Sequence, residues 1–171
     1  MRFVILDNNY PHEENLYGDV FAHVRVKSYQ EHHECVVCSL THSNDYEYEG
    51  VTVKAFRTEG QLLDFILAFS PDLLLVHFAN GPFIDGAILP SGIPTLVWVH
   101  GYEALAWTSR IFQFPWRACL PHKFLQRSRS DKSRLAPFKR LVELSNRTGE
   151  IRFLFVSEWM RGKAQSDLNV R

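Results

Sequence analysis

The stretch DLLLVHFANGPFIDGAILPSGIPTLVWVHGYE, residues 72–103, decides the fold. It contains two short apolar runs, 73–76 and 95–99, and each run is followed directly by a histidine, His77 and His100. Uninterrupted apolar runs of this length are typical of parallel strands whose two faces are both covered by helices. The carboxyl ends of parallel strands meet at one edge of the sheet, where such folds bind ligands. We therefore predict that both imidazoles lie at that edge.

The rest of the chain alternates between strand and helix patterns in the same way. Strands are predicted at residues 2–7, 34–40, 50–57 and 151–156, and helices at 19–32, 59–70 and 157–168. Residues 41–49 are polar and are predicted to form a turn. Strands separated by helical crossovers specify an α/β fold: a Rossmann-like open, mostly parallel sheet with helices on both faces. With 171 residues and 46% hydrophobic content, the chain is long enough for one such domain, 1–171.

One segment does not fit this alternation. Residues 104–149 are too long for a single crossover, and they interleave aromatic residues with Arg and Lys. We predict a basic aromatic helical insertion here, with helices at 105–114 and 133–144. Pro137 is expected to interrupt or to start the second of these helices.

The zero net charge of the chain conceals a strong asymmetry. Residues 1–106 carry 5 Lys and Arg against 14 Asp and Glu, a net charge of −9, whereas 107–152 carry 11 against 3, a net charge of +8. A concentrated basic segment indicates an anionic partner. We expect eight cations to face an anionic membrane surface or an anionic acceptor: Arg117, Lys123, Arg127, Arg129, Lys132, Arg134, Lys139 and Arg140. A solvated helix face is the plainer alternative, and the segment carries no recognisable nucleic-acid-binding motif, so we expect no nucleic acid partner.

The cysteines and the N-terminus indicate the compartment. The three cysteines are odd in number, the chain begins directly with a strand-like run, and no segment approaches the roughly 18 apolar residues of a spanning helix. We therefore expect a cytoplasmic protein whose contact with the inner membrane face, where it occurs, is peripheral.

The residues after His100 make it a stronger site candidate than His77. Gly101 lets the backbone turn sharply, and Glu103 is placed to orient an imidazole or to accept a ligand hydroxyl. His77 has no such neighbours. For His77, a half-exposed side chain bonded to backbone is the plainer interpretation.

Several motifs, taken in their order along the chain, resemble one known family. They are RFVILDNNYP, GDVFAHVRVKSY, EGVTVKAF, SPDLLLVHF, GIPTLVWVHGYE and IRFLFVSEWMRGKA, and their span covers nearly the whole chain. Together they resemble the N-terminal domain of retaining family 4 glycosyltransferases of the two-domain GT-B type. The resemblance implies two Rossmann-like domains, the first binding the acceptor and the second holding most of the sugar nucleotide. Residues 1–171 would be the first domain, with little or no transfer activity until a C-terminal donor-binding domain joins it.

The same resemblance implies site residues. His100 matches the family histidine that contacts the transferred hexose, so it is the predicted catalytic residue. Residues at or near strand ends are expected to bind the donor sugar or the acceptor: Asn8, Tyr10, Gly18, His77, Gly101, Glu103, Ser157 and Glu158. Ser157 is equally suited to cap the last helix. The family often has two adjacent glycines where this chain has Gly18 and Asp19, and a carboxylate there would repel the donor phosphate.

The expected ligands also follow from the resemblance. The donor would be a UDP- or GDP-sugar bound as substrate, with no metal required and no tightly bound cofactor. The acceptor would be a glycan or a lipid-linked sugar. Retaining transfer through an oxocarbenium-like transition state needs positioning and charge stabilisation rather than a strong protein nucleophile.

Two other functions are left open by the sequence. His12, Glu13 and Glu14 faintly resemble the metal loop of zinc-dependent sugar deacetylases, and with His77 or His100 they offer nitrogen and oxygen ligands to zinc. The order Pro-His, rather than His-Pro, counts against this hydrolase. The second alternative is a non-catalytic α/β binding module. The sequence contains no P-loop and no GxGxxG motif, which argues against nucleotide hydrolysis and dinucleotide binding.

Overall fold

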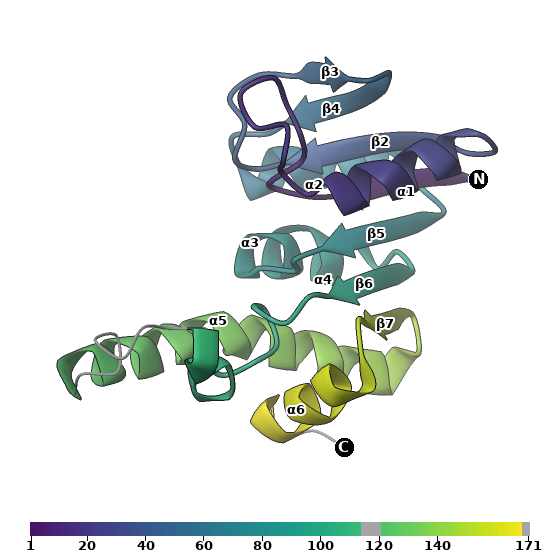
Figure 1. Ribbon diagram of the computed structural model, residues 1–171. Helices are drawn as coiled ribbons and strands as arrows, with labels where there is room; N and C mark the ends of the chain where they lie inside the picture. Colours follow the sequence, from purple (N-terminus) through teal and green to yellow (C-terminus); the bar gives the residue numbers. More distant parts are fainter. Residues whose placement is uncertain (114–120, 169–171) are drawn as a thin grey trace.

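The computed structural model describes residues 1–113 and 121–168, and the side chains in these ranges except those of 111–113 and 121–129. Its centre is one seven-stranded sheet (Figure 1). In chain order the strands are β1 (Arg2–Leu6), β2 (Glu34–Ser39), β3 (Tyr46–Tyr48), β4 (Val51–Ala55), β5 (Leu73–His77), β6 (Thr95–Val99) and β7 (Ile151–Phe155). Their order across the sheet is β3-β4-β2-β1-β5-β6-β7. The predicted α/β fold with a mostly parallel open sheet is confirmed.

Every described pair of neighbouring strands is parallel except β3 with β4, which is antiparallel. The prediction of a turn over 41–49 is therefore wrong in part, because Tyr46 and Tyr48 are half-buried and alternate with exposed Glu47 as an edge strand does. Without β3 the order is that of a doubly wound sheet. Such a sheet reverses its winding between β1 and β5, and ligands bind at the carboxyl edge of that switch point.

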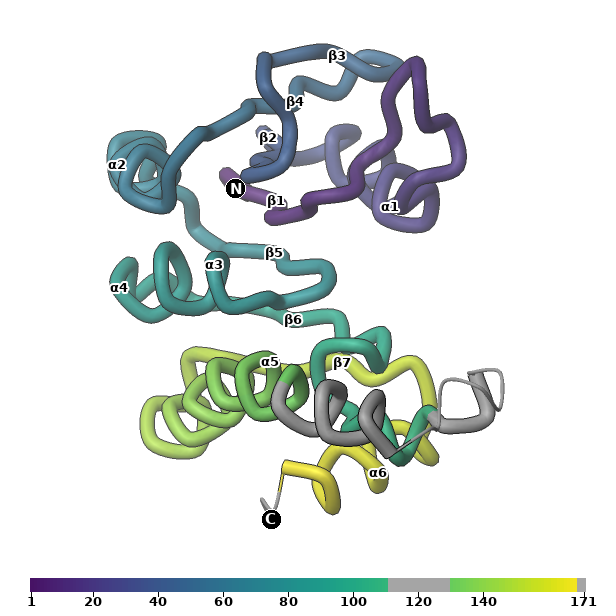
Figure 2. Tube along the Cα trace, turned by 90° about the vertical axis from the view of Figure 1, so that its left-hand side faces the viewer, coloured from purple at the N-terminus to yellow at the C-terminus, as the bar shows by residue number. Residues whose placement is uncertain are grey.

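Helices cover both faces of the sheet. α1 (Val20–Gln30) lies on one face, and α2 (Glu59–Phe69), the helical segment 81–91 and α5 (Pro121–Thr148) lie on the other (Figure 2). Segment 81–91 consists of α3 (Gly81–Phe83), the π-helical turn η1 (Ile84–Ile88) and α4 (Leu89–Ser91). The remaining described helices are η2 (Trp107–Gln113), which is 3-10, and α6 (Glu158–Leu168).

Two apolar cores hold these layers together. Consecutive residues of β5 point into different cores, because successive strand side chains face opposite ways: Leu74 packs with α2 and α5, and Leu75 packs on the α1 side. The first core includes Phe138 of α5, and the second includes Val26 of α1. Burying a side chain of this size contributes about 1.5–3 kcal/mol. A sheet buried on both faces explains the uninterrupted apolar runs in the sequence.

The sequence pattern does not predict segment 81–91, because five of the twelve residues 81–92 are Gly or Pro. Asn80 starts the segment by accepting a hydrogen bond from the backbone N–H of Phe83 at 3.0 Å. Proline is tolerated in the first turn of a helix, where its missing N–H would be unpaired anyway. Burial of Phe83 and Ile84 then fixes the segment against the sheet.

The described part of the insertion contains a short 3-10 helix and one long α-helix. α5 runs through residues 121–148 with Pro137 inside it, so the helix predicted at 133–144 is confirmed, although it is longer and Pro137 neither starts nor interrupts it. Within the predicted helix at 105–114, residues 107–113 form a 3-10 helix. Proline removes one helical hydrogen bond and usually bends or breaks a helix. Here Phe138 and Leu141 are completely buried, and this burial offsets the lost bond. Among the described residues, no helix combines the length and the apolar character that crossing a membrane requires.

Candidate functional site

The two histidines of the deciding stretch meet at the carboxyl edge of the sheet. β5 and β6 are paired neighbours, and His77 Nδ1 lies 3.1 Å from His100 Nε2. The imidazole of His77 also stacks on Trp98, with ring centroids 4.9 Å apart and planes 13° apart. Parallel pairing thus brings together two side chains that are 23 residues apart in the sequence.

Both imidazoles are held in the neutral form near pH 7. His77 is 2% exposed, and burial, with the nearby charges of His100 and Arg25, lowers its pKa to about 3. Burial and the charge of Arg25 lower the pKa of His100 to about 4. A neutral imidazole has one N–H and one lone pair, so one ring donates a hydrogen bond to the other. The contact between the rings uses Nδ1 of His77 and Nε2 of His100. Of the two other ring nitrogens, only Nδ1 of His100 is available to a ligand, because His77 is buried.

Aromatic rings enclose the histidine pair. Phe78 stacks on His100 with ring centroids 4.3 Å apart, and Phe21 of α1 lies 4.7 Å from the same imidazole. Phe78 adopts a φ of +52°, in the left-handed region that bulky side chains rarely occupy. Strain of this kind costs on the order of 1–3 kcal/mol and is typically found at functional sites.

Two adjacent pockets open beside this cluster, and Phe78 and Tyr102 line both of them. The first, here called the His100 pocket, has a volume of about 300 Å³ and is lined by Phe78, His100, Gly101, Tyr102, Leu105, Arg110, Trp159 and Met160. The second, the switch-point pocket, has a volume of about 350 Å³ and is lined by Asn8, Asn9, Asp19, Phe78, Asn80 and Tyr102. The second lies where β1 and β5 end, which is the position that the strand order predicts for a ligand.

Glu103 fixes the turn that carries His100. It is 3% exposed, and its Oε1 accepts a hydrogen bond from the backbone N–H of His100 at 2.7 Å. Burial raises the pKa of Glu103, while hydrogen bonds from the backbone of this turn act in the opposite direction. Gly101 has a φ of +114° in the same turn, a conformation that favours glycine. Glu103 therefore orients the backbone of the turn rather than the imidazole ring.

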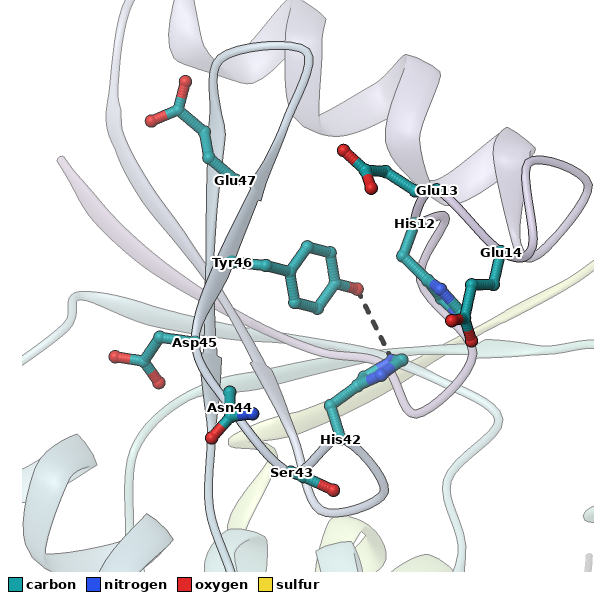
Figure 3. Close-up of a pocket in the computed structure, with 9 residues that line it drawn as sticks. All are labelled: His12, Glu13, Glu14, His42, Ser43, Asn44, Asp45, Tyr46 and Glu47. Carbon is teal, nitrogen blue, oxygen red and sulfur yellow. Dashed lines mark hydrogen bonds between the residues drawn. The ribbon is translucent and has the colours of Figure 1, made fainter.

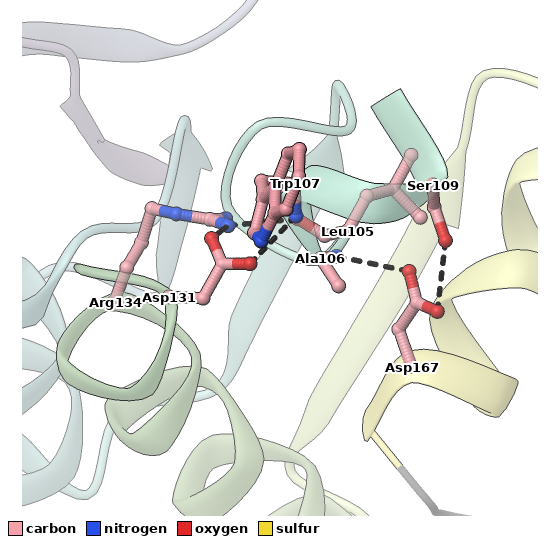
Figure 4. Close-up of polar contacts among 7 residues, drawn as sticks. All are labelled: Leu105, Ala106, Trp107, Ser109, Asp131, Arg134 and Asp167. Carbon is pink, nitrogen blue, oxygen red and sulfur yellow. Dashed lines mark hydrogen bonds and ion pairs between the residues drawn. The ribbon is translucent and has the colours of Figure 1, made fainter. Parts of the chain in front are cut away.

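A polar network fixes the loop that forms the far wall of the His100 pocket (Figure 4). Asp131 of α5 accepts the backbone N–H of Trp107 at 2.6 Å and pairs with Arg134, which also donates to the Leu105 carbonyl at 2.8 Å. Asp167 of α6 accepts the backbone N–H of Ala106 and the hydroxyl of Ser109, both at 2.9 Å. The insertion and the last helix therefore brace the pocket.

A pair of buried carboxyls lies at the switch point. Asp7 is completely buried and accepts the backbone N–H of Asn9 at 2.8 Å; Asp19 is 7% exposed and accepts Asn9 Nδ2 at 3.2 Å. Apart from the other carboxyl of the pair, the second oxygen of each has no hydrogen-bond partner among the described residues. Burial and the charge of Asp19 raise the pKa of Asp7 well above its usual range, and burial also raises the pKa of Asp19.

The predicted residues after β1 have different roles. Asn8 lines the switch-point pocket, and its Oδ1 accepts the backbone N–H of Leu40 at 2.8 Å. Tyr10 is completely buried and its hydroxyl lies 2.8 Å from His23 Nδ1, so it belongs to the core and not to the edge. Gly18 is needed for packing, since a Cβ there would lie 2.3 Å from the Asn9 carbonyl.

The predicted residues after β7 lie beside the His100 pocket without lining it. Ser157 caps α6 by accepting the backbone N–H of Met160 at 3.2 Å, and Glu158 is exposed and pairs with Arg161 at 2.7 Å. Trp159, the next residue, lines the pocket and is 55% exposed. Sequence reasoning missed Trp159, Arg110 and Phe78, although an aromatic residue directly after the strand that ends at His77 was an available signal for Phe78.

The eight predicted surface cations fall into two groups. Arg117 lies outside the described residues, as do the side chains of Lys123, Arg127 and Arg129. Lys132 is exposed and Lys139 is half-buried. Arg134 pairs with Asp131, and Arg140 pairs with Asp85 at 2.6 Å. Two of the four described cations are therefore already matched by carboxylates, which leaves less charge for an anionic surface than the sequence predicts.

His12, Glu13 and Glu14 line a different cavity, beside β3, of about 640 Å³ (Figure 3). The ring of His12 lies 5.0 Å from that of His42, whose Nε2 is 3.4 Å from the Tyr46 hydroxyl. Neither of the histidines that would complete the expected zinc site lines this cavity. Within the described ranges, no group of three or more His, Cys, Asp or Glu side chains is placed to hold a metal ion.

Comparison with known proteins finds no matching family model and no matching curated protein.

Proposed function

We propose that the chain is the acceptor-side domain of a retaining glycosyltransferase and that the His100 pocket receives the transferred hexose. The observation that carries this proposal is the neutral His77–His100 pair at the carboxyl edge, next to the switch point of a doubly wound sheet. Ligands bind at this edge in such sheets. The fold alone is compatible with many activities, so the chemistry of the pocket must support the choice.

The His100 pocket suits a sugar ring. Phe78 and Trp159 give it apolar walls, against which the C–H face of a pyranose can pack, and a neutral imidazole can accept from or donate to a hydroxyl. Arg110, 8% exposed, adds a fixed positive charge next to these groups. A guanidinium in a partly desolvated site stabilises negative charge that develops on a leaving phosphate.

In this proposal the residues position the sugar rather than react with it. His100 holds a hydroxyl of the hexose, His77 fixes the His100 ring through the 3.1 Å contact, and Glu103 fixes the turn below. Positioning of this kind lowers the barrier without a protein nucleophile. The nucleotide part of a UDP- or GDP-hexose would be held by a donor-binding domain, and transfer by this chain alone would be very slow.

The proposal predicts that the isolated chain binds the hexose part of a sugar nucleotide weakly. In saturation-transfer NMR with UDP- and GDP-hexoses at millimolar concentration, we expect transfer to the hexose ring protons. His100→Ala should weaken binding about tenfold, since one hydrogen bond and one packing face are lost. His32→Ala removes an exposed histidine after α1 and should change nothing.

The outcome that contradicts the proposal is equally clear. If no hexose shows saturation transfer at millimolar concentration, or if His100→Ala binds as tightly as the original chain, the His100 pocket is not a sugar site.

A further inference from the structure

The switch-point pocket is not used by the proposed hexose site, and its charge is unusual. Asp19 contributes a carboxyl to its wall, with Asp7 as the buried partner of that carboxyl. None of the six lining residues that the structure describes is Lys or Arg. A carboxyl pair out of water is costly unless a cation or a donor accompanies it. Among the described residues, the hydrogen-bond donors to the pair are the two groups of Asn9 and, when one carboxyl is protonated, that carboxyl itself.

Neither Asp7 nor Asp19 forms an ion pair with a described Lys, Arg or His side chain. Burial is the first cause that raises the pKa of each carboxyl, and no Lys or Arg is among the groups that shift either pKa. The second oxygen of Asp19 has no N–H donor among the described residues. The pocket therefore offers a desolvated acceptor that no described Lys or Arg neutralises.

The side-chain amides of Asn8 and Asn80, which line the pocket, can bind hydroxyl groups of a ligand. The Oδ1 atoms of Asn8 and Asn80 are occupied by backbone N–H groups of Leu40 and Phe83, at 2.8 and 3.0 Å. Neither Nδ2 group takes part in a hydrogen bond to another described residue, so both can donate to a ligand. A volume of about 350 Å³ accommodates a ligand of the size of one or two sugar rings.

We propose that the switch-point pocket binds a polyhydroxylated ligand that carries a protonated amine, with the ammonium placed against Asp19 and the hydroxyls against the Asn8 and Asn80 amides. The ammonium supplies the counter-charge that the carboxyl pair lacks. A phosphate is excluded, because Asp19 lies at the start of α1, where an anion would otherwise be favoured. One part of the inference rests on the proposed function, namely that this ligand is the acceptor of the transferred sugar. The acceptor would then be an amino sugar or a related amine.

The test uses three probes of one shape: methyl 2-amino-2-deoxyglucoside, methyl glucoside and the N-acetylated form of the first. Binding is measured by NMR titration at pH 6.5, where the amine is protonated. We expect the amine to bind at least tenfold more tightly than the two neutral probes. Asp19→Asn keeps the shape and the Asn9 contact and should abolish this preference. Asp64→Asn, which removes an exposed carboxylate from α2, should keep it.

Two results would overturn the inference: equal affinity for the three probes in the original chain, or an unchanged preference for the amine in Asp19→Asn. Thermal melts of each variant establish that it is folded. His100→Ala provides the separation from the proposed function, since it should leave the amine preference intact. If hexose binding at His100 fails while the amine preference persists, the proposed function is wrong and the assignment of the switch-point pocket stands. If hexose binding persists while the amine preference is absent, only the assignment of the switch-point pocket is wrong.

Discussion

Replacing His77 by asparagine should flatten the dependence of stability on pH between 6.5 and 4. The pKa of His77 is about 3 in the folded chain and about 6.5 when unfolded. Above pH 6.5 both states carry a neutral ring. As the pH falls below 6.5, the imidazole of His77 binds a proton in the unfolded chain but not in the folded chain, so the free energy of unfolding decreases. At pH 4 this loss amounts to roughly 3 kcal/mol for His77 alone.

Urea denaturation at several pH values between 7.5 and 4 measures this effect. Asparagine can still donate to His100, but it loses the stacking on Trp98, so the variant should be less stable at pH 7.5 by roughly 1 kcal/mol. Its stability should then fall less steeply with acid than that of the original chain. His32→Ala should keep the original slope. Parallel curves for His77→Asn and the original chain would show that His77 titrates normally.

Replacing Asp7 by asparagine should stabilise the protein at pH 8. Because the folded chain raises the pKa of Asp7, the unfolded chain releases this proton at a lower pH than the folded chain does. The contribution of protonated Asp7 to the free energy of unfolding is therefore fully present below pH 3.8 and is lost as the pH rises through the raised pKa. Asparagine carries no charge and keeps the 2.8 Å bond to the Asn9 N–H through its Oδ1. Relief of the desolvated charge should contribute about 1–3 kcal/mol.

The thermal midpoint of Asp7→Asn at pH 8 should lie above that of the original chain by about 2–4 °C for each kcal/mol gained in the free energy of unfolding. At pH 3.5 the gain should vanish, because Asp7 is then protonated in the original chain as well. Asp64→Asn should leave the midpoint unchanged. A lower midpoint for Asp7→Asn at pH 8 would mean that the carboxylate is stabilised in a way that the described contacts do not show. A carboxyl pair that destabilises the fold is expected where it serves a ligand.

The strands and the meeting of the two histidines were predictable from the sequence for a simple reason. Apolar runs buried on both faces are visible in the letters themselves, and parallel pairing places the residues that follow them at one edge. The same reasoning fails for segment 81–91, where Gly and Pro suggest a loop while tertiary burial of Phe83 stabilises helical turns. It fails for Pro137 because packing of Phe138 outweighs a local helix-breaking preference.

The pocket walls were less predictable, because they depend on contacts between distant parts of the chain. Tyr10 follows β1 as Asn8 does, yet one side chain turns into the core and the other lines the pocket. The position of Arg110 depends on the network from Asp131 and Asp167, which no spacing in the sequence indicates. The pairing of Asp7 with Asp19 depends likewise on how the loop after β1 folds back onto the start of α1.

The central claim is that a neutral imidazole pair at the carboxyl edge presents His100 to a sugar. Its most direct test is NMR of the histidine ring nitrogens at pH 6.5, before and after addition of a saturating UDP- or GDP-hexose. We predict neutral-ring signals for both His77 and His100, and a shift of the His100 signal when the sugar is added. Imidazolium signals at this pH, or a His100 ring that does not respond to the bound sugar, would contradict the account.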